Sequence, residues 1–261
     1  MQKMHGFMRP KAHGRVIFCA GSGFVPIRRS AQRLRHNRRM DWQAARVSLL
    51  LAVLTAALLL PPGVAVARWL ALTSWRGKPL AEALLMLPLL LPPTVVGFYL
   101  LLLFGQASII GAWLAAHSSV RLVFSFDGLL LASLLINLPF MVQPIQRTFA
   151  AIPHSLREAA WVCGLGRWRT FARIELPLAW PGLVSGVALT AAHTLGEFGV
   201  VLMVGGSIPG QTRTLSIAIF DRVQAFDLHA AHVMALALVL CSVVAVALVF
   251  AADRRRPLQE R

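Results

Sequence analysis

Five long stretches without a charged side chain constrain the fold of this chain more than any other feature. They separate Arg46 from Arg68, Glu82 from Arg121, Asp127 from Arg147, Glu175 from Glu197 and Asp227 from Asp253, and their lengths are 21, 38, 19, 21 and 25 residues. A helix needs about 20 apolar residues to cross the hydrocarbon core of a bilayer, so each stretch can hold one transmembrane helix. Transmembrane β-strands would instead alternate apolar and polar residues. The sequence therefore predicts an all-α, polytopic membrane protein of about five transmembrane helices.

The composition agrees, because only 14% of the residues are charged, against about 25% in soluble domains. We predict the spans at residues 47–67, 84–104, 128–146, 181–203 and 232–251. The 38-residue stretch is too short for two helices and a turn. Its second half, Gln106 to His117, predicts a short helix at the membrane interface, with Ile109, Ile110, Trp113 and Leu114 on one side. A sixth span in this region is the alternative.

Residues 1–39 differ from the rest, because they contain ten Lys or Arg and no Asp or Glu. They lack the apolar run of at least about 7 residues that a secretory signal needs. An Arg-rich, acid-poor segment is also typical of an organellar transit peptide or a nucleic-acid-binding arm, but no other part of the chain fits a nucleic-acid role. We interpret residues 1–39 as a disordered extension, or as one assigned from a start codon placed too early, and residues 40–261 as the transmembrane domain, which begins near Met40.

The distribution of Lys and Arg predicts an orientation. If loop 155–173 is cytoplasmic, the N-terminus lies outside and the C-terminus inside. Twelve basic residues then face the cytoplasm: Arg68, Arg76, Lys78, Arg147, Arg157, Arg167, Arg169, Arg173, Arg254, Arg255, Arg256 and Arg261. Four lie outside: Arg46, Arg121, Arg213 and Arg222. This excess agrees with the positive-inside rule. The ten basic residues of the extension would overturn it, so either the extension is absent from the mature protein or the orientation is wrong.

The loop after the third predicted span has a defined spacing. It reads Glu158-Ala159-Ala160, three residues, Gly164, nine residues, Ile174, one residue, then Leu176-Pro177. The pattern predicts two helices on the membrane surface, with Ser155 and Glu158 as a capping box for the first. Gly164 and Gly166 would form the turn, Arg167 to Ile174 the second helix, and Pro177 its end. The small alanines would leave a ridge that could dock into a groove on another protein. An ordinary amphipathic connector is the alternative.

This spacing resembles the coupling loop of permease subunits of binding-protein-dependent ABC importers, the type I architecture. The resemblance implies that the residues of the motif contact the ATPase: Glu158, Ala159, Ala160, Gly164, Ile174, Leu176 and Pro177. Three further segments, Leu87–Gly97, Ala192–Gly199 and Gly206–Thr214, resemble the molybdate permeases of that family. Sulfate and tungstate permeases share the Gly-Glu-Phe-Gly element at 196–199, so permeation of tungstate, sulfate or thiosulfate is the alternative.

The resemblance runs from about Trp42 to Val249, and it implies the rest of the machinery. The expected assembly is a homodimer in the bilayer of the cell inner membrane, with two cytoplasmic ABC ATPase subunits and a periplasmic molybdate-binding protein. Transport would proceed by alternating access. His193 departs from the Arg or Ser that family members commonly have near this position, which weakens any role assigned to it.

Several residues at membrane depth are candidates for the translocation path or its gate. Prolines interrupt the second and third predicted spans, and such backbone is tolerated beside neighbouring helices or a water-filled cavity. His193 lies one helical turn before Glu197, and a buried His–Glu pair is the plain interpretation; a role in the path or gate is the alternative. The candidates are Pro92, Pro93, Asn137, His193, Thr194 and Glu197, with weak donors at Ser133, Gln143, Ser185 and Thr190. A predicted outer loop holds Thr212, Arg213 and Thr214. Arg213 would receive the anion or contact the binding protein, and a simple surface arginine is the alternative.

Other chemistries find little support in the sequence. There is no Gly-x4-Gly-Lys-Ser/Thr phosphate loop, so a partner must supply the ATPase. An intramembrane hydrolase is the alternative from a different class, but no His-Glu-x-x-His motif or paired nucleophile and base is present. Cys19, Cys163 and Cys241 have no paired spacing, and His229 with His232 is better explained by head-group solvation than by a metal. We therefore expect no catalytic, cofactor-binding or metal site.

Overall fold

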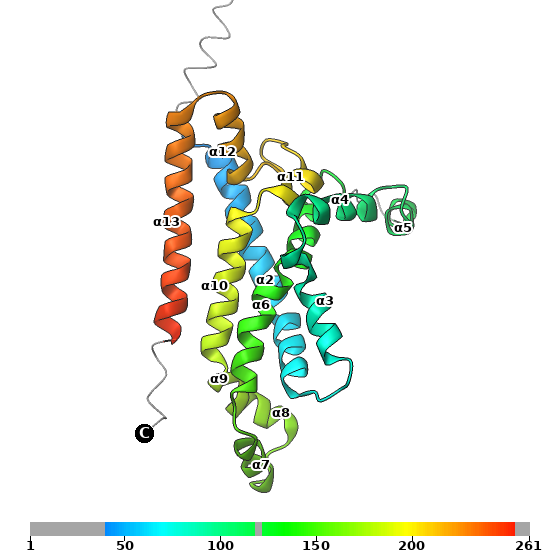
Figure 1. Ribbon diagram of the computed structural model, residues 1–261, viewed down its shortest axis with the longest axis vertical. Coiled ribbons are helices and arrows are strands. Elements are labelled where there is room, and N and C mark those ends of the chain that lie inside the picture. Colours follow the sequence, from blue (N-terminus) through cyan, green and yellow to red (C-terminus); the bar gives the residue numbers. More distant parts are fainter. Residues whose placement is uncertain (1–39, 118–121, 254–261) are drawn as a thin grey trace, which may run out of the picture. The chain divides into compact units, whose positions relative to one another are not determined.

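The computed structural model describes residues 40–117 and 122–253, and every regular element in these ranges is a helix (Figure 1). The helices are α2 (Trp42–Leu72), α3 (Lys78–Leu90), α4 (Pro93–Phe104), α5 (Ile109–His117), α6 (Phe126–Ala150), α7 (His154–Val162), α8 (Arg167–Thr170), the π-helix η1 (Phe171–Glu175), α9 (Leu176–Leu178), α10 (Trp180–Gly196), α11 (Gly199–Gly205), α12 (Leu215–Gln224) and α13 (Leu228–Asp253). Residues 1–39, interpreted as an extension, lie outside the described residues. So do five basic residues used to predict the orientation, at positions 121, 254–256 and 261.

The all-α prediction is confirmed, and the described residues hold three to five candidate membrane spans. Three helices are long and apolar enough to cross a membrane alone, namely α2, α6 and the Leu228–Ala247 part of α13. The number reaches five if each of two bent pairs forms one span, namely α3 with α4 and Arg167–Leu178 with α10, which are bent by 105° and 67°. The predicted short helix before His117 is α5, which is too short for a sixth span. Ile109 and Trp113 are exposed on α5, whereas the side chains of Ile110 and Leu114 lie outside the described part.

The second predicted span, 84–104, is interrupted by proline, as the sequence predicts. The chain leaves the helix at Leu91, which is extended at φ −80° and ψ 144°, and a new helix starts at Pro93. Proline disfavours the helical conformation in the residue before it, and Pro92 imposes that restriction on Leu91. The Pro92 carbonyl then accepts hydrogen bonds from Val95 and Val96, which begins α4.

The fourth predicted span, 181–203, is also interrupted. Helix α10 ends at Gly196, Glu197 is extended at φ −66° and ψ 130°, and α11 begins at Gly199. The carboxylate Oε1 of Glu197 accepts the backbone N–H of Val200 at 3.1 Å. Glu197 therefore caps the start of α11 in place of continuing α10.

The prediction that prolines also interrupt the third span is wrong, because the helix continues through them. Pro139 and Pro144 lie inside α6, which is continuous from Phe126 to Ala150. The Thr148 hydroxyl is directed at the Pro144 carbonyl (3.3 Å) and donates to the Ile145 carbonyl (2.8 Å). Helix α6 packs against α2 and α10, and neighbouring helices let transmembrane helices tolerate proline.

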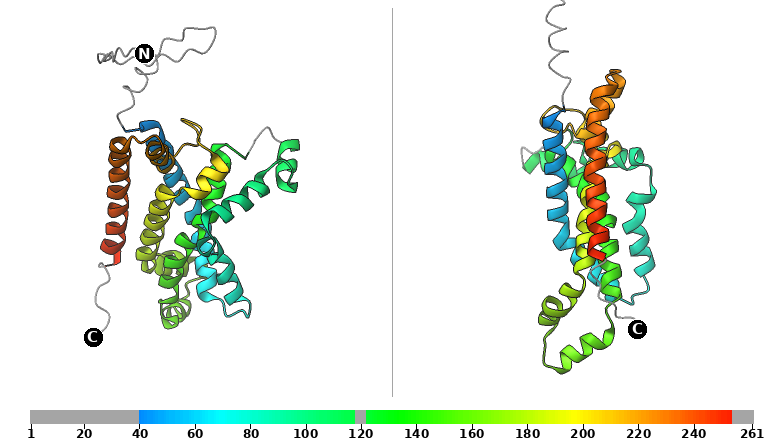
Figure 2. Two further views of the ribbon diagram at one scale, coloured as in Figure 1. Left: turned by 45° about the horizontal axis from the view of Figure 1, so that its top comes forward. Right: turned by 90° about the vertical axis from the view of Figure 1, so that its left-hand side faces the viewer.

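The core of the bundle is formed by α2, α6 and α10, and glycines bring α10 close to α6. A Cβ built on Gly182 would come within 2.2 Å of Thr148 Oγ1 and 2.8 Å of the Pro144 carbonyl oxygen. A Cβ on Gly186 would lie 2.9 Å from the Met141 carbonyl oxygen. Two small residues four apart allow such close approach between membrane helices. Figure 2 shows α13 at one edge of this bundle and α4 with α5 at the opposite edge.

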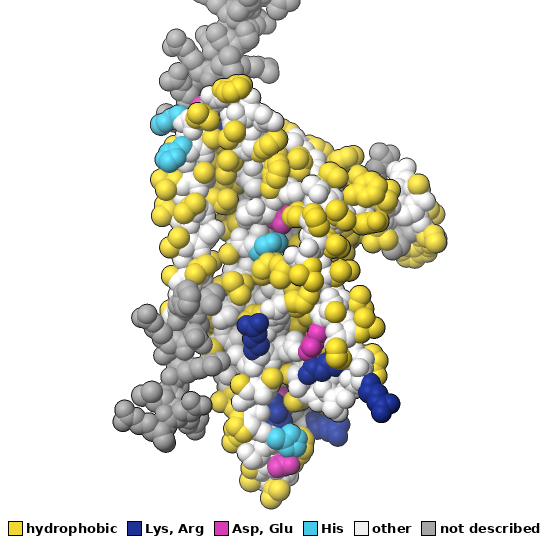
Figure 3. Space-filling model, viewed as in Figure 1, with side chains coloured by type: hydrophobic (Ala, Val, Ile, Leu, Met, Phe, Trp, Pro, Cys, Tyr) yellow, Lys and Arg dark blue, Asp and Glu magenta, His cyan; other side chains and the backbone are white. Residues whose placement is uncertain are grey.

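Charge divides the two ends of the bundle. Figure 3 shows an apolar surface over most of the visible face, with the Lys and Arg side chains mostly gathered at the end that carries α7 and α8. The start of α2 lies at the other end, and the end of α13 is directed toward the basic end (Figure 1).

We expect Gly182→Ala to lower the apparent unfolding temperature of the purified protein in detergent, because the added methyl group meets the backbone of α6. Overpacking of this kind costs about 1–3 kcal/mol. Gly196→Ala is the matched control, since nothing lies within 4 Å of a Cβ at that end of α10. Equal unfolding temperatures for the two variants in a thermal scan would show that α10 does not depend on this close approach.

Candidate functional site

The turn between α7 and α8 depends on Gly164. Gly164 has φ +79°, as predicted. Its N–H donates to the Trp161 carbonyl at 2.9 Å, and the Leu165 N–H donates to the Ala160 carbonyl at 2.9 Å. This pair of bonds is a Schellman motif, in which the left-handed residue after the helix is usually glycine. The turn sets the direction in which α8 leaves α7.

Two other predictions about this loop are wrong. Pro153 precedes α7 and no side chain caps the helix, so Ser155 and Glu158 do not form a capping box. The Glu158 carboxylate instead contacts His154 Nδ1 at 2.9 Å, one turn back on the same helix. Gly166 is extended at φ −68° and has nothing within 4 Å of a Cβ. A residue with a Cβ could therefore occupy position 166.

The predicted coupling residues fall into an exposed group and an anchored group. Glu158 and Ala159 are exposed on α7, whereas Ala160 is buried. Leu176 packs against the core cluster around Phe149, and Ile174 is half-buried. Pro177, in the first turn of α9, precedes the 67° change of direction into α10. The exposed face of α7 also carries three apolar side chains: Leu156, Trp161 and Val162.

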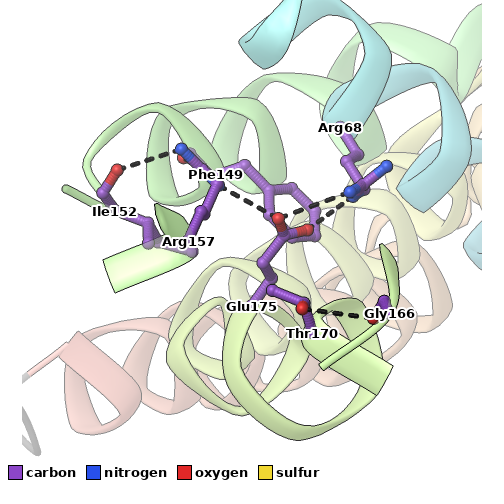
Figure 4. A network of polar contacts seen from close by, with 7 residues as sticks. All are labelled: Arg68, Phe149, Ile152, Arg157, Gly166, Thr170 and Glu175. Carbon is purple, nitrogen blue, oxygen red and sulfur yellow. Dashed lines mark hydrogen bonds and ion pairs between the residues drawn. The ribbon is translucent and has the colours of Figure 1, made fainter. Parts of the chain in front are cut away.

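A buried carboxylate that the sequence reasoning missed holds this region together (Figure 4). Glu175 on η1 is 1% exposed and accepts Arg68 Nε at 2.5 Å and Arg157 Nε at 3.0 Å. Arg157 is also buried, and its two terminal nitrogens donate to the carbonyls of Phe149 (2.9 Å) and Ile152 (3.2 Å). One ion-pair network therefore joins the end of α2, the end of α6, α7 and η1.

A second polar network crosses the bundle at the depth of the predicted path. The Thr55 hydroxyl donates to Ser133 Oγ at 3.0 Å, and Asn137 Nδ2 donates to the Ser133 carbonyl at 2.8 Å. Asn137 Oδ1 lies 3.1 Å from His193 Nδ1, and His193 Nε2 lies 3.6 Å from Glu197 Oε2. Because Asn137 Nδ2 donates to Ser133, Asn137 Oδ1 faces His193 and can accept a hydrogen bond from Nδ1 of that ring.

His193 and Glu197 lie beside each other, as the plain interpretation expected, but only Glu197 is buried and His193 is partly open. The His193 side chain is 29% exposed, that of Glu197 is 9% exposed, and Phe140 stacks on the imidazole at 4.1 Å between ring centroids. Thr194 is buried and donates back to the Thr190 carbonyl at 2.8 Å, so its hydroxyl is already satisfied within α10.

The two helix breaks lie beside each other. A Cβ on Gly199 would come within 2.8 Å of Pro93 Cβ, and one on Gly97 would lie 3.2 Å from the Val200 Cα. Helix α4 therefore packs closely on α11. The structure thus brings exposed Pro93 next to the segment of Glu197, while Pro92 is also exposed at the first break.

The residues of the predicted outer loop are mostly engaged in local contacts. The Thr212 hydroxyl donates to the Gly205 carbonyl at 2.6 Å, and buried Thr214 contacts Ser216 Oγ at 2.9 Å. Arg213 lies 3.5 Å from Asp41 Oδ2 and 3.0 Å from Asp221 Oδ2. Two carboxylates offset the charge of Arg213, so this geometry favours a structural arginine over an open anion receptor.

Metal-binding groups were not expected, and no cluster of three or more His, Cys, Asp or Glu side chains is found within 40–117 and 122–253. His229 and His232 are exposed, as are Cys163 and Cys241, which are free thiols. Cys19 lies outside the described residues.

We expect Glu175→Ala to destabilise the protein strongly, because Arg157 would be left as an unpaired buried charge. Breaking one partner of a buried ion pair costs roughly 3–5 kcal/mol. Glu158→Ala is the matched control, since an exposed pair such as Glu158–His154 contributes about 0–1 kcal/mol. Thermal unfolding of both variants measures the difference, and a similar small effect for both would show that the Glu175 network does not hold the fold.

Comparison with known proteins agrees with this architecture. Residues 30–256 match the family model described as "Binding-protein-dependent transport system inner membrane component". The molybdenum transport system permease protein of Azotobacter vinelandii is 46% identical over 202 residues, which cover 77% of this chain and 89% of that protein. The sulfate transport system permease protein CysT of Escherichia coli is 35% identical over 175 residues, which cover 66% of this chain and 63% of that protein.

A solved structure shows a similar fold. It is the crystal structure of a bacterial ABC transporter involved in the import of the acidic polysaccharide alginate. The match has a TM-score of 0.66 at 16% sequence identity, and it covers 88% of this chain and 83% of the other.

Proposed function

The chain belongs to the family of inner membrane components of binding-protein-dependent transport systems, and from this premise we propose that it is the membrane-spanning subunit of an ATP-driven molybdate importer. The observation that carries the substrate is the 46% identity to a molybdenum permease over 89% of that relative. The sulfate permease is less similar and is matched over a smaller share of its length, so sulfate remains the alternative, with tungstate. Because the family consists of transport components, an intramembrane hydrolase is no longer a candidate.

The exposed face of α7 is the proposed contact with the ATPase. It combines Glu158 and Ala159 with apolar Leu156, Trp161 and Val162. Aromatic and aliphatic side chains with a charge at the rim are typical of protein interfaces. The anchored half of the motif, Ile174 with Leu176, would tie this contact to the bundle.

The proposed path runs between two copies of the chain, along the face where His193 is partly exposed. The described spans carry few cations at that depth, so an anion would pass without being held tightly. Glu197 is not a proposed ligand, because its carboxylate is engaged by Val200 and lies beside His193. The adjacent breaks at Pro92–Pro93 and Glu197–Phe198 are the proposed gate. A periplasmic molybdate-binding protein would deliver the anion, and two cytoplasmic ATPases would drive alternating access in the homodimer.

The proposed orientation has the N-terminus outside and the C-terminus in the cytoplasm. The gathering of Lys and Arg at the end with α7 and α8 (Figure 3) supports it through the positive-inside rule. Residues 1–39 lie outside the described residues, so the interpretation of this basic segment stays a prediction.

Gly164→Val should leave the subunit inserted while transport-coupled ATP hydrolysis is lost, because valine is strained at φ +79°. A left-handed conformation costs a residue with a Cβ about 1–2 kcal/mol, and relief of that strain would turn α7 away from the ATPase. Gly166→Val is the matched control, since Gly166 has an ordinary φ of −68° and equal open space. Normal coupling in a well-inserted Gly164→Val subunit, measured as ATPase stimulation in liposomes, would contradict the role of this loop.

Reconstitution with the cognate ATPase and binding protein tests the substrate. In vesicles of established orientation, molybdate-loaded binding protein should stimulate ATP hydrolysis and move the anion toward the ATPase side. If sulfate alone supports both at sub-micromolar levels, the substrate proposal fails while the importer proposal stands. If no loaded oxyanion-binding protein stimulates hydrolysis, both proposals fail.

A further inference from the structure

A groove at the basic end of the bundle is not used by the proposed transport mechanism. It has a volume of about 740 Å³ and lies between the second half of α2 and the segment α8–η1. Its apolar walls include Val64, Ala65, Trp69 and Trp168, and two arginines, Arg68 and Arg167, line it as well. The groove thus combines a long apolar wall with a cationic group from each side.

The balance of charge around the groove is positive. Arg68 and Arg157 share the single carboxylate of Glu175, which leaves one excess positive charge in that network. The Arg68 side chain is still 33% exposed. Arg167 is exposed, and within the described part of the chain no carboxylate lies within ion-pair distance of it. An anionic group between Arg68 and Arg167 would complement this charge.

The groove also extends along a transmembrane helix. Its lining on α2 runs from Pro61 to Leu72, which corresponds to about 17 Å at 1.5 Å per residue. Trp69 is 51% exposed and Trp168 is 83% exposed, and tryptophan is enriched where the hydrocarbon core meets the head groups. A water-soluble partner cannot follow α2 to that depth, whereas an acyl chain can.

We propose that this groove binds one anionic phospholipid, with its phosphate between Arg68 and Arg167 and an acyl chain along Val64 and Ala65. Bound there, the lipid bridges the end of α2 to α8, next to the ion-pair network that positions α7. This inference needs only that the chain is embedded in a bilayer, and it does not depend on which anion is transported.

The test is native mass spectrometry of the full-length chain in its native assembly, titrated with palmitoyl-oleoyl phosphatidylglycerol or with the matching phosphatidylcholine. Wild-type protein should retain a first phosphatidylglycerol in preference to phosphatidylcholine. Arg167→Gln should lower that preference about fivefold, the effect expected for one arginine near an anionic lipid surface. Arg169→Gln removes the same charge from the same helix but does not line the groove, so it should keep the wild-type preference.

A second pair of variants tests the apolar wall. Ala65→Phe fills the groove without changing its charge and should weaken retention of the first phosphatidylglycerol. Ala57→Phe places the same side chain at another exposed position of α2, away from the groove, and should have no effect. The proposal is overturned if phosphatidylglycerol is not preferred, or if Arg167→Gln and Arg169→Gln act equally. It is also overturned if Ala65→Phe changes the number of protein chains per assembly while lipid retention stays as in wild type, because a protein would then cover the groove.

Discussion

A carboxylate buried beside two arginines at the base of the bundle organises the end of the protein proposed to meet the ATPase. Burying an isolated charge costs several kcal/mol even after the protein relaxes, so Glu175 is stable there only with Arg68 and Arg157 in place. Arg157 is buried as well, and it uses its remaining donors on the carbonyls of Phe149 and Ile152. The network therefore cannot be satisfied unless α2, α6, α7 and η1 hold one relative arrangement. The exposed face of α7 is positioned by that requirement.

A different constraint acts at membrane depth, where backbone groups freed by a helix break need new partners. At the second break, the Glu197 carboxylate accepts the Val200 N–H, and the Ser216 hydroxyl donates to the Glu197 carbonyl at 2.6 Å. This accounts for an acidic residue in a subunit proposed to pass a dianion. The carboxylate serves as a helix cap with His193 beside it, so its charge is directed into the protein rather than toward the anion.

The all-helical fold and the Gly164 turn could be predicted, because long apolar stretches and a glycine after a helix act locally on the chain. It was harder to predict which prolines end a helix, because the effect of a proline depends on the helices packed around it. Pro92 ends a helix because Leu91 becomes extended, whereas Pro139 and Pro144 remain inside α6, packed between α2 and α10. Glu175 was missed because its partners are 107 and 18 residues away in the sequence. A single acidic residue between apolar Ile174 and Leu176, at the start of a span, was the available signal.

Helix α10 joins these two polar regions. It begins five residues after Glu175 and runs without interruption to Gly196, directly before Glu197, a length of about 24 Å at 1.5 Å per residue. Its glycines at 182 and 186 bring it into close contact with the backbone of α6, and such tight packing favours a straight, rigid helix. A displacement of η1 by the partner ATPase would therefore be carried along α10 as a nearly rigid rod. The first point at which that rod can bend is Glu197–Phe198, beside Pro93, and this is the reason to place the gate where the two helix breaks meet.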